Sequence, residues 1–497
     1  MESITLIINR LLKNQTIKNA YFSVIDAVFL PFAMLAATPL FLKQLGAEQY
    51  GIWMLINSII ASMAILNIGG ADVVTKYVSA YRKDENTQNI KQVFSTVFIL
   101  QIILAAIISF LIIWLAPIFV TSGIFKVELK YQPLFAQSLI FGGFLFVIKM
   151  IEQVMIGFLR GQERYDLSSL MSIFSKSILI ITQILVVIND GNLSALFLYS
   201  FIVLSLILGI EIIGLKLLYL EAQFLTSFSI NTLTELLNFS GWAWLLSLAL
   251  LFTSQIDRWL IGALVGMEVL AYYAIALLVF NQIHAIIASS LSWIFPKVSK
   301  MGVNKETTQL LYYAQSYAIL LSSLVSLFLL YFNEIFLFWL GEESYQLIAN
   351  YLKYFLVLQP IYSLPIVYYY FINGAGLIKY NFFIVTFHFL LKLFLILLLF
   401  NRLEMLGIMI GIGISMIIST GYLLWIAKTK IGLIELPIFK LMIPVILYAI
   451  IGFYMITYGL NGIVFSVVIV LLSIAYYKSY LDGYMSFFGQ LLKLKLK

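Results

Sequence analysis

The chain consists of long apolar runs separated by short polar segments. Fourteen of these runs reach about 18 residues or more, the length at which an apolar stretch can cross a membrane as an α-helix. They lie near residues 20–41, 51–69, 93–118, 134–158, 169–188, 194–218, 240–264, 269–293, 311–332, 346–372, 381–400, 405–426, 441–458 and 462–478. This pattern predicts an all-α polytopic membrane protein with about 14 transmembrane helices.

Composition supports this class and argues against several others. Hydrophobic residues make up 62% of the chain and charged residues 11%, whereas soluble domains carry about 25% charged residues. The chain has no Cys, and His284 and His388 stand far apart, so we expect neither a metal site nor a cofactor. No polar segment carries a basic stripe interleaved with aromatic residues, so we expect no nucleic-acid partner.

The Lys and Arg residues collect on one side of the predicted membrane helices. With a cytoplasmic N-terminus, only Lys43, Lys126, Lys130 and Arg402 fall in outside loops, and most other cations fall in inside segments. We therefore expect a multi-pass protein with both termini in the cytoplasm. The first apolar run is longer than a signal-peptide core and no small-residue cleavage site follows it, so we expect it to be retained as a span.

Two short motifs recur along the chain. Residues 45–53 (LGAEQYGIW) and 265–273 (VGMEVLAYY) share a Gly, a Glu, a small residue and an aromatic at an offset of 220. The sequence FLRG at 158–161 is echoed by FING at 371–374. Two echoes at matching helices indicate a six-helix duplication in which both copies have the same orientation. We expect an N-terminal six-helix lobe at 1–220, a C-terminal six-helix lobe at 235–430, and an accessory helix pair with a basic cytoplasmic tail at 431–497.

These motifs also resemble those of a known family. The run 41–53 (FLKQLGAEQYGIW), followed by Ile68-Gly69-Gly70 and the polar helix at 76–83, is similar to the opening of bacterial polysaccharide flippases. The second half carries similar motifs at 255–258 (QIDR), 261–262, 265–266, 272–274 and 295–299 (FPKVS). Over about residues 20–430, the chain resembles the O-antigen and capsule repeat-unit flippases of the multidrug, oligosaccharidyl-lipid and polysaccharide exporter superfamily. It departs at Ala271, where the family usually has Gly.

The resemblance implies a transporter of polysaccharide biosynthesis in the plasma (inner) membrane of a bacterium. It implies that an isoprenyl-diphosphate-linked oligosaccharide is flipped from the cytoplasmic to the outer leaflet by alternating access between the two lobes. The partners would be this lipid-linked oligosaccharide, membrane lipid, H⁺ or Na⁺ as a coupling ion, and polysaccharide polymerase or assembly proteins.

Four cations lie inside apolar runs, namely Lys149, Lys176, Arg258 and Lys392. A cation in hydrocarbon costs about 3 kcal/mol on insertion scales, so such side chains usually face a bundle interior or a water-filled cavity. We expect these four to line a central cavity and bind the diphosphate, with Lys392 the strongest candidate because its predicted helix contains no acid. Two alternatives stay open. Lys149 and Glu152 can neutralise each other on one helix face, and Lys176 can extend to the cytoplasmic surface.

Acidic residues inside the spans are candidates for ion coupling. Asp26, Asp257 and Glu152 lie within apolar runs, where a carboxylate can bind Na⁺ or carry a proton. Asp26 precedes Pro31 by five residues, and proline tends to kink a helix, so this helix could serve as a gating element. In the alternative, Asp26 only solvates an inner vestibule. Glu211 lies near a helix end, where we expect a surface role.

Other functions remain as alternatives. A flippase for the lipid-linked peptidoglycan precursor would share the fold and a cationic cavity. A multidrug or cation antiporter would favour an acidic cavity and usually twelve helices. A membrane polymerase or ligase of polysaccharide synthesis would usually carry a long outside loop. The chain has neither such a loop nor a phosphate-binding Gly-Lys-Ser/Thr motif, so we expect it not to be an enzyme.

Overall fold

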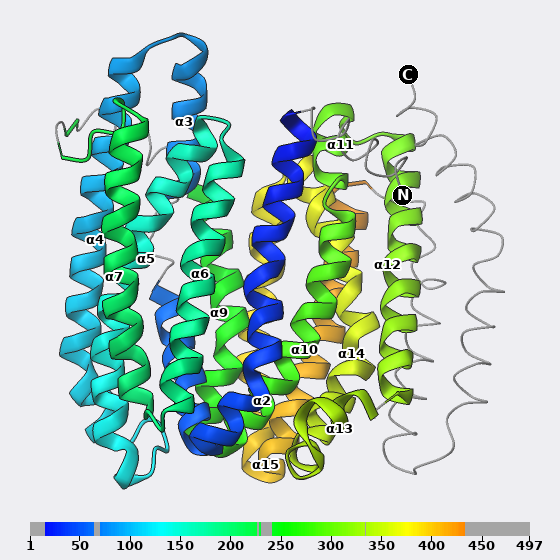
Figure 1. Cartoon of the computed structure of the whole chain (residues 1–497). Helices are drawn as coiled ribbons and strands as arrows, with labels where there is room; N and C mark the ends of the chain where they lie inside the picture. Colours follow the sequence, from blue (N-terminus) through cyan, green and yellow to red (C-terminus); the bar gives the residue numbers. More distant parts are fainter. Residues whose placement is uncertain (1–14, 64–69, 226–227, 230–240, 333, 433–497) are drawn as a thin grey trace, which may run out of the picture. The chain divides into compact units, whose positions relative to one another are not determined.

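The structure is a computed structural model that describes residues 15–63, 70–225, 228–229, 241–332 and 334–432. In this part of the chain the regular elements are helices, shown in Figure 1. They are α2 (Gln15–Met63), α3 (Gly70–Lys83), α4 (Thr87–Thr121), the 3-10 turn η2 (Leu129–Tyr131), α5 (Gln132–Gly161), α6 (Tyr165–Ile188), α7 (Leu193–Leu218), α9 (Gly241–Leu264), α10 (Met267–Leu291), α11 (Ile294–Met301), α12 (Lys305–Tyr331), α13 (Glu334–Leu340), α14 (Glu342–Gly374) and α15 (Ile378–Lys430).

The predicted spans agree with these helices. Each run from 20–41 to 405–426 coincides with helix wherever its residues are described, and nine helices in that part of the chain are long and apolar enough to cross a membrane. The prediction of an all-α polytopic membrane protein is therefore confirmed. The last two predicted spans, 441–458 and 462–478, lie outside the described residues, so the number 14 stays a prediction.

Two of the long helices each contain two predicted spans. In α2 the helical backbone breaks at Gly46, with φ 76° and ψ 163°. In α15 it breaks at Glu404, with φ 47° and ψ −128°. Glycine adopts positive φ without a steric penalty, whereas Glu404 holds a backbone conformation that side chains disfavour. The sequence motif around Gly46 thus marks a real change of chain direction.

The chain divides into two compact units, residues 1–271 and 272–497, and the border falls inside α10. Unit 1 contains α2 to α9 and the start of α10, and unit 2 contains the remainder. The expected lobe borders near residues 220 and 235 stay a prediction.

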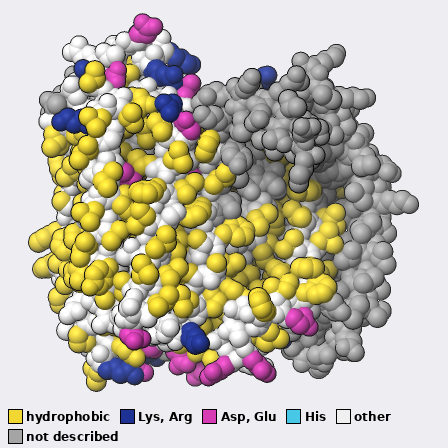
Figure 2. Space-filling view, in the orientation of Figure 1, with side chains coloured by type: hydrophobic (Ala, Val, Ile, Leu, Met, Phe, Trp, Pro, Cys, Tyr) yellow, Lys and Arg dark blue, Asp and Glu magenta, His cyan; other side chains and the backbone are white. Residues whose placement is uncertain are grey.

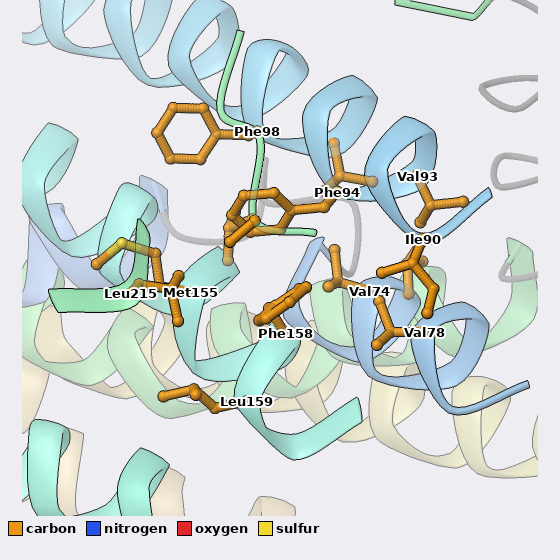
Figure 3. Packing of buried hydrophobic residues seen from close by; sticks show 14 residues of the cluster. Val74, Val78, Ile90, Val93, Phe94, Phe98, Met155, Phe158, Leu159 and Leu215 are labelled. Carbon is orange, nitrogen blue, oxygen red and sulfur yellow. The ribbon is translucent and has the colours of Figure 1, made fainter. Parts of the chain in front are cut away.

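The core of unit 1 is an aromatic cluster where α3, α4 and α5 meet (Figure 3). The ring of Phe94 lies 4.9 Å from that of Phe158 and 5.3 Å from that of Phe224, measured between centroids. Such pairs contribute about 0.5–1.5 kcal/mol each beyond the burial of their area. This packing holds α4 against α5, and Val74 and Val78 bring the polar helix α3 into the same cluster.

Unit 2 has a corresponding core along α10 and α14. Phe280 lies 5.0 Å from Phe355 and 4.8 Å from Tyr362, and His284 stacks edge-on against Tyr362 at 5.0 Å. A second group around Ile319, Leu358 and Met416 connects α12, α14 and α15.

The two repeated FxxG motifs make matching contacts. A Cβ added to Gly161 would meet the Val78 Cβ at 2.7 Å and the Thr75 carbonyl oxygen at 3.1 Å, both on α3. A Cβ added to Gly374 would meet the Phe295 carbonyl oxygen at 2.7 Å and the Val298 Cβ at 3.0 Å, both on α11. Val78 and Val298 are separated by the same offset of 220 as the first repeated motif. In each unit, a glycine at the end of a long helix admits a short polar helix, which supports the duplication.

The surface of the described helices is strongly apolar. Large side chains such as Phe110, Trp114 and Leu206 are at least 60% exposed in mid-helix. Figure 2 shows hydrophobic side chains covering the visible face of the described residues, with Lys, Arg, Asp and Glu gathered toward the helix ends. An exposed apolar face of this extent is typical of helices that face lipid.

Candidate functional site

A buried ion pair joins the first two helices of the site in unit 1. Asp26 on α2 is 6% exposed, and its Oδ1 accepts a hydrogen bond of 2.6 Å from the Lys176 Nζ on α6. The same Nζ donates to the backbone oxygen of Asp26 at 3.3 Å. The second carboxylate oxygen of Asp26 lies 3.5 Å from a guanidinium nitrogen of Arg160 on α5. One buried carboxylate therefore bridges two cations from two other helices.

The two cations differ from Asp26 in their exposure. The side chain of Asp26 is 8% exposed, whereas those of Lys176 and Arg160 are 23% and 32% exposed. Lys176 pairs with Asp26. Such a pair is expected, because a cation without a partner is costly in hydrocarbon. Both cations are therefore more exposed than the carboxylate that they contact.

A second group of polar side chains adjoins this bridge. The Ser175 hydroxyl donates to the Glu211 Oε1 on α7 at 2.7 Å, and Glu152 on α5 also interacts with Ser175. Glu152 interacts electrostatically with Lys149 on its own helix and with Lys176 and Asp26. Glu211 likewise interacts with Glu152 and Lys149.

We call these residues the ion network: Asp26, Lys149, Glu152, Arg160, Ser175, Lys176 and Glu211. It joins α2, α5, α6 and α7, and it contains three carboxylates and three cations. Equal numbers of opposite charges reduce the cost of placing ions in a low-dielectric bundle. Removing one of its six ionisable members would unbalance these charges.

The network includes residues named in the open alternatives and adds residues that the sequence did not single out. Lys149 and Glu152 interact within α5, as one alternative proposed. Arg160 was placed only among the inside-loop cations, and Glu211 was expected at the surface. Glu211 is instead half-buried and bonded to Ser175. A signal for Arg160 existed, because it lies within the repeated motif at 158–161.

Ion pairs outside the spans hold the end of unit 1 where α3 lies. The Arg82 guanidinium donates to the Gln162 carbonyl oxygen at 2.8 Å and lies 3.2 Å from a carboxylate oxygen of Glu163. Arg164 forms a two-pronged pair with Asp166 at 3.0 and 3.2 Å. This pairing raises the pKa of Arg164, since the carboxylate favours the charged guanidinium. These contacts fix the α5–α6 turn, which follows Arg160 directly.

Asp257 and Arg258 are adjacent residues on α9. Asp257 is 4% exposed. A guanidinium nitrogen of Arg258 donates to the Gln255 Oε1 at 2.5 Å, and Arg258 also interacts electrostatically with Tyr50 of α2. The neighbouring Trp259 indole donates to the Ser58 hydroxyl at 3.1 Å, which fixes α9 against the second half of α2. In the described part of the chain, Arg258 therefore interacts with Gln255 and Tyr50.

Lys392 is the candidate cation of unit 2. It lies in the first half of α15 and is 5% exposed, so its ammonium is deeply buried. Burial of this degree agrees with the expectation that Lys392 does not face lipid. The structure thus places Lys149, Lys176, Asp26 and Glu152 together in one network. The single cavity joining all four predicted cations stays a prediction, as do the roles of the site residues. Among the described residues, no group of three or more His, Asp or Glu side chains is placed to hold a metal ion.

Solved structures show which fold this arrangement belongs to. A multidrug resistance MATE family transporter of the MOP superfamily, in an inward-facing conformation, superposes with a TM-score of 0.70 at 14% identity, covering 83% of this chain and 99% of its own. The lipid II flippase MurJ, in an inward closed conformation, gives 0.69 at 15% identity, covering 93% and 100%. A MOP superfamily transporter from Pyrococcus furiosus, described as having a binding pocket of reverse polarity, gives 0.52 at 13% identity, covering 82% and 95%.

These structures establish the MOP superfamily fold for this chain. Sequence identities of 13–15% show a shared fold and do not identify the substrate. No curated protein matches the sequence. The family model described as polysaccharide biosynthesis protein matches residues 44–347, which is more than half of the chain. The chain belongs to this polysaccharide biosynthesis family.

Proposed function

We propose that this protein is a membrane transporter that flips an isoprenyl-diphosphate-linked oligosaccharide across the bacterial inner membrane. The observation that carries the proposal is the family match, which connects a MOP-fold membrane protein with polysaccharide biosynthesis. Sugars assembled on a lipid carrier at one face of the membrane must cross it before they are used at the other face. A MOP-type fold can supply this step.

The ion network suggests how the charged headgroup is received. A diphosphate carries negative charge that must leave water, and Lys and Arg can offset that cost with charge-assisted hydrogen bonds. Lys176 and Arg160 are partly exposed and point their charged groups at Asp26. We propose that the diphosphate contacts these two cations, while Asp26 holds them in place when the site is empty. Lys149, Arg258 and Lys392 would serve the headgroup at later points of its path.

Transport by purified protein tests this proposal. Protein in liposomes with a fluorescent isoprenyl-diphosphate oligosaccharide should move the lipid between leaflets, as measured by quenching from outside. Lys176→Gln should lower the rate about tenfold to a hundredfold, the loss expected for one charge-assisted hydrogen bond. Lys216→Gln, which changes an exposed Lys at the end of α7, should leave the rate unchanged. No flipping by the unmodified protein would refute the proposed function.

Lys392 provides a separate test in unit 2. Lys392→Ala should abolish flipping while the protein still reaches the membrane, because a buried cation that offsets the diphosphate would be gone. Lys392→Arg should retain part of the rate, since the charge is kept. Full activity of the Ala variant would assign Lys392 to packing within α15.

A flippase for the lipid-linked peptidoglycan precursor is the second candidate. The similarity to the lipid II flippase favours it, because that superposition covers more of this chain than those with the other two transporters named above. The two candidates can be separated in the same liposomes by offering both lipids at equal concentration. Faster flipping of the peptidoglycan precursor than of the oligosaccharide lipid would favour the second candidate.

A further inference from the structure

The short helix α13 of unit 2 has one buried face and one exposed aromatic face. Phe336 and Leu340 are 5% and 8% exposed, and α13 packs on α14. Phe338, on another side of the same helix, is 95% exposed, and Ile335 beside it is 45% exposed. A phenylalanine that is exposed to this degree loses free energy in water, so the surroundings of this face need an explanation.

The exposed face of α13 continues the apolar surface of α12. The ring of Phe332 lies 4.6 Å from that of Phe328, measured between centroids, and Phe328 is 51% exposed on α12. The Ile335 N–H donates to the Phe332 carbonyl oxygen at 3.2 Å, so α13 begins directly beside this pair. Helix α12 is long and apolar enough to cross a membrane, and its exposed apolar side chains therefore face lipid. The same apolar strip passes from this lipid-facing surface onto α13.

The position of α13 in the chain places it at a membrane boundary. It connects α12 and α14, which are both candidate spans. Figure 1 shows α13 at the end of unit 2 opposite α11. Helix α11 carries Lys297 and Lys300, whereas the segment 331–347 contains three Glu and no Lys or Arg. Cations collect on the cytoplasmic side of membrane proteins, so this segment belongs to the outer side.

We propose that α13 is an interfacial helix, which lies in the headgroup region of the outer leaflet and inserts Phe338 and Ile335 into the lipid. Glu334 is exposed one turn before Phe338, so the exposed face has a charged end that can stay in water. Aromatic side chains are favoured at this depth, where a ring meets both headgroups and acyl chains. The proposal concerns a contact with membrane lipid and does not depend on the transport function proposed above.

Lipid fits this face better than a basic protein surface does. The exposed carboxylates of Glu334, Glu342 and Glu343 could attract a basic partner. The apolar strip, however, joins α13 to the side of α12 that faces hydrocarbon, and a soluble partner cannot follow it there. Anchored in this way, the connection between α12 and α14 would hold the ends of both spans at a fixed depth in the bilayer.

Fluorescence quenching measures the depth of α13 in the intact chain. The chain contains no Cys, so Phe338→Cys gives a single thiol for a bimane label, at a position whose exposure spares the packing. In liposomes, we expect lipids brominated near the headgroup end of the acyl chain to quench this label severalfold more than lipids brominated at mid-chain. Leu206→Cys, 66% exposed in the middle of α7, should show the reverse order. Glu343→Cys should be quenched by iodide in the water.

Two results of this measurement would overturn the proposal. Quenching of the Phe338→Cys label by iodide alone would place α13 in water, as a docking surface for a soluble protein requires. Quenching by neither iodide nor brominated lipid would show that another part of the chain covers this face.

Two further variants test the role of Phe338 and the side of the membrane. A label on Ile335→Cys should lose its quenching by brominated lipid when Phe338→Asp is added and keep it with Phe338→Trp. Unchanged quenching with Asp would show that Phe338 does not anchor the helix. Glu342→Cys in intact cells should react with a membrane-impermeant maleimide. Reaction only after the cells are opened would overturn the assignment to the outer leaflet.

Discussion

The carboxylate of Asp26 and the ammonium of Lys176 are 150 residues apart in sequence and 2.6 Å apart in space. Each would be costly alone in a bundle of apolar helices, and each is stabilised by the other. Breaking a buried pair costs more than the pair contributes, because the remaining charge stays buried. This asymmetry gives the pair a measurable thermodynamic signature.

Asp26→Asn should lower the free energy of unfolding by about 1–3 kcal/mol. The lower figure is the contribution of an exposed ion pair, and the upper one is the loss when one partner of a buried pair is removed. The double variant Asp26→Asn/Lys176→Gln restores charge balance in the ion network, so it should be more stable than the sum of the single losses predicts. Denaturant unfolding in detergent measures this difference. Strict additivity would show that the two side chains do not stabilise each other.

The exposed pair Glu128–Lys130 is the control for this cycle. Its side chains are 56% and 65% exposed, so water and salt screen their attraction. Substituting both should give additive effects with no measurable coupling.

At this scale the sequence identified the charged residues better than their partners. A Lys inside an apolar run is visible without a structure, and so Lys149, Lys176 and Lys392 could all be named. Which acid neutralises Lys176 depends on how α2 packs against α6, and no local pattern encodes that. Glu211 shows the same limit. Its position near a helix end predicted an exposed side chain, whereas Ser175 on a neighbouring helix donates a hydrogen bond to it.

The helices pack closest where glycine replaces a side chain. At Gly161 and Gly374 the long helices α5 and α14 end against the short helices α3 and α11. Backbone atoms form part of each contact, so the neighbour cannot rotate away as a flexible side chain would. These two positions should tolerate no added volume.

Gly374→Ala should destabilise the protein by about 1–3 kcal/mol, since its methyl would meet the Phe295 carbonyl oxygen at 2.7 Å. Gly209→Ala on α7 is the matched control, because nothing lies within 4 Å of the added methyl. We expect the control to be neutral or slightly stabilising, as alanine favours a helix. The melting temperatures of the two variants in detergent test this difference. Equal melting temperatures would contradict the close contact at Gly374.

The apolar runs predicted the positions of the long helices well, but they predicted the breaks within α2 and α15 only in part. The polar segment around Gly46 predicted the end of one span and the start of the next. The break at Glu404 was placed correctly between 381–400 and 405–426, but its positive φ could not be foreseen, because glutamate rarely adopts it. The short helix α13 was also not predicted, since seven residues are too few to show a period.

Across the whole molecule, the duplication preserves packing and not charge. The offset that aligns 158–161 with 371–374 places Tyr362 at the position of Lys149 and Asn373 at the position of Arg160. Asn373 accepts a hydrogen bond of 2.8 Å from Asn381, so a neutral amide pair stands where the first repeat has an ionic residue. The two repeats therefore share a scaffold while only the first carries this ion network.

The buried acids of both repeats lead to a prediction about energy supply. We expect net uphill movement of the lipid-linked substrate to depend on an H⁺ or Na⁺ gradient, with Asp26, Asp257 and Glu152 as the residues that exchange the ion. An ion drives such a cycle only when its affinity differs between the two open states. Collapse of both gradients in liposomes should stop uphill movement, and unchanged accumulation would refute coupling. Coupling that persists in Asp26→Asn and Asp257→Asn would refute only the assignment to those two acids.

The tight turn at Glu404 also bears on how the chain is made. Residues on either side of it pack back to back, because a Cβ added to Gly407 would lie 2.5 Å from the Leu399 carbonyl oxygen, and one added to Gly411 would lie 3.0 Å from the Ile396 backbone nitrogen. Small residues four apart allow such close approach between membrane helices. The two halves of α15 thus complete this interface with each other alone. They can enter the bilayer already paired as a hairpin, after α10 to α14, which precede them in the chain, have left the ribosome.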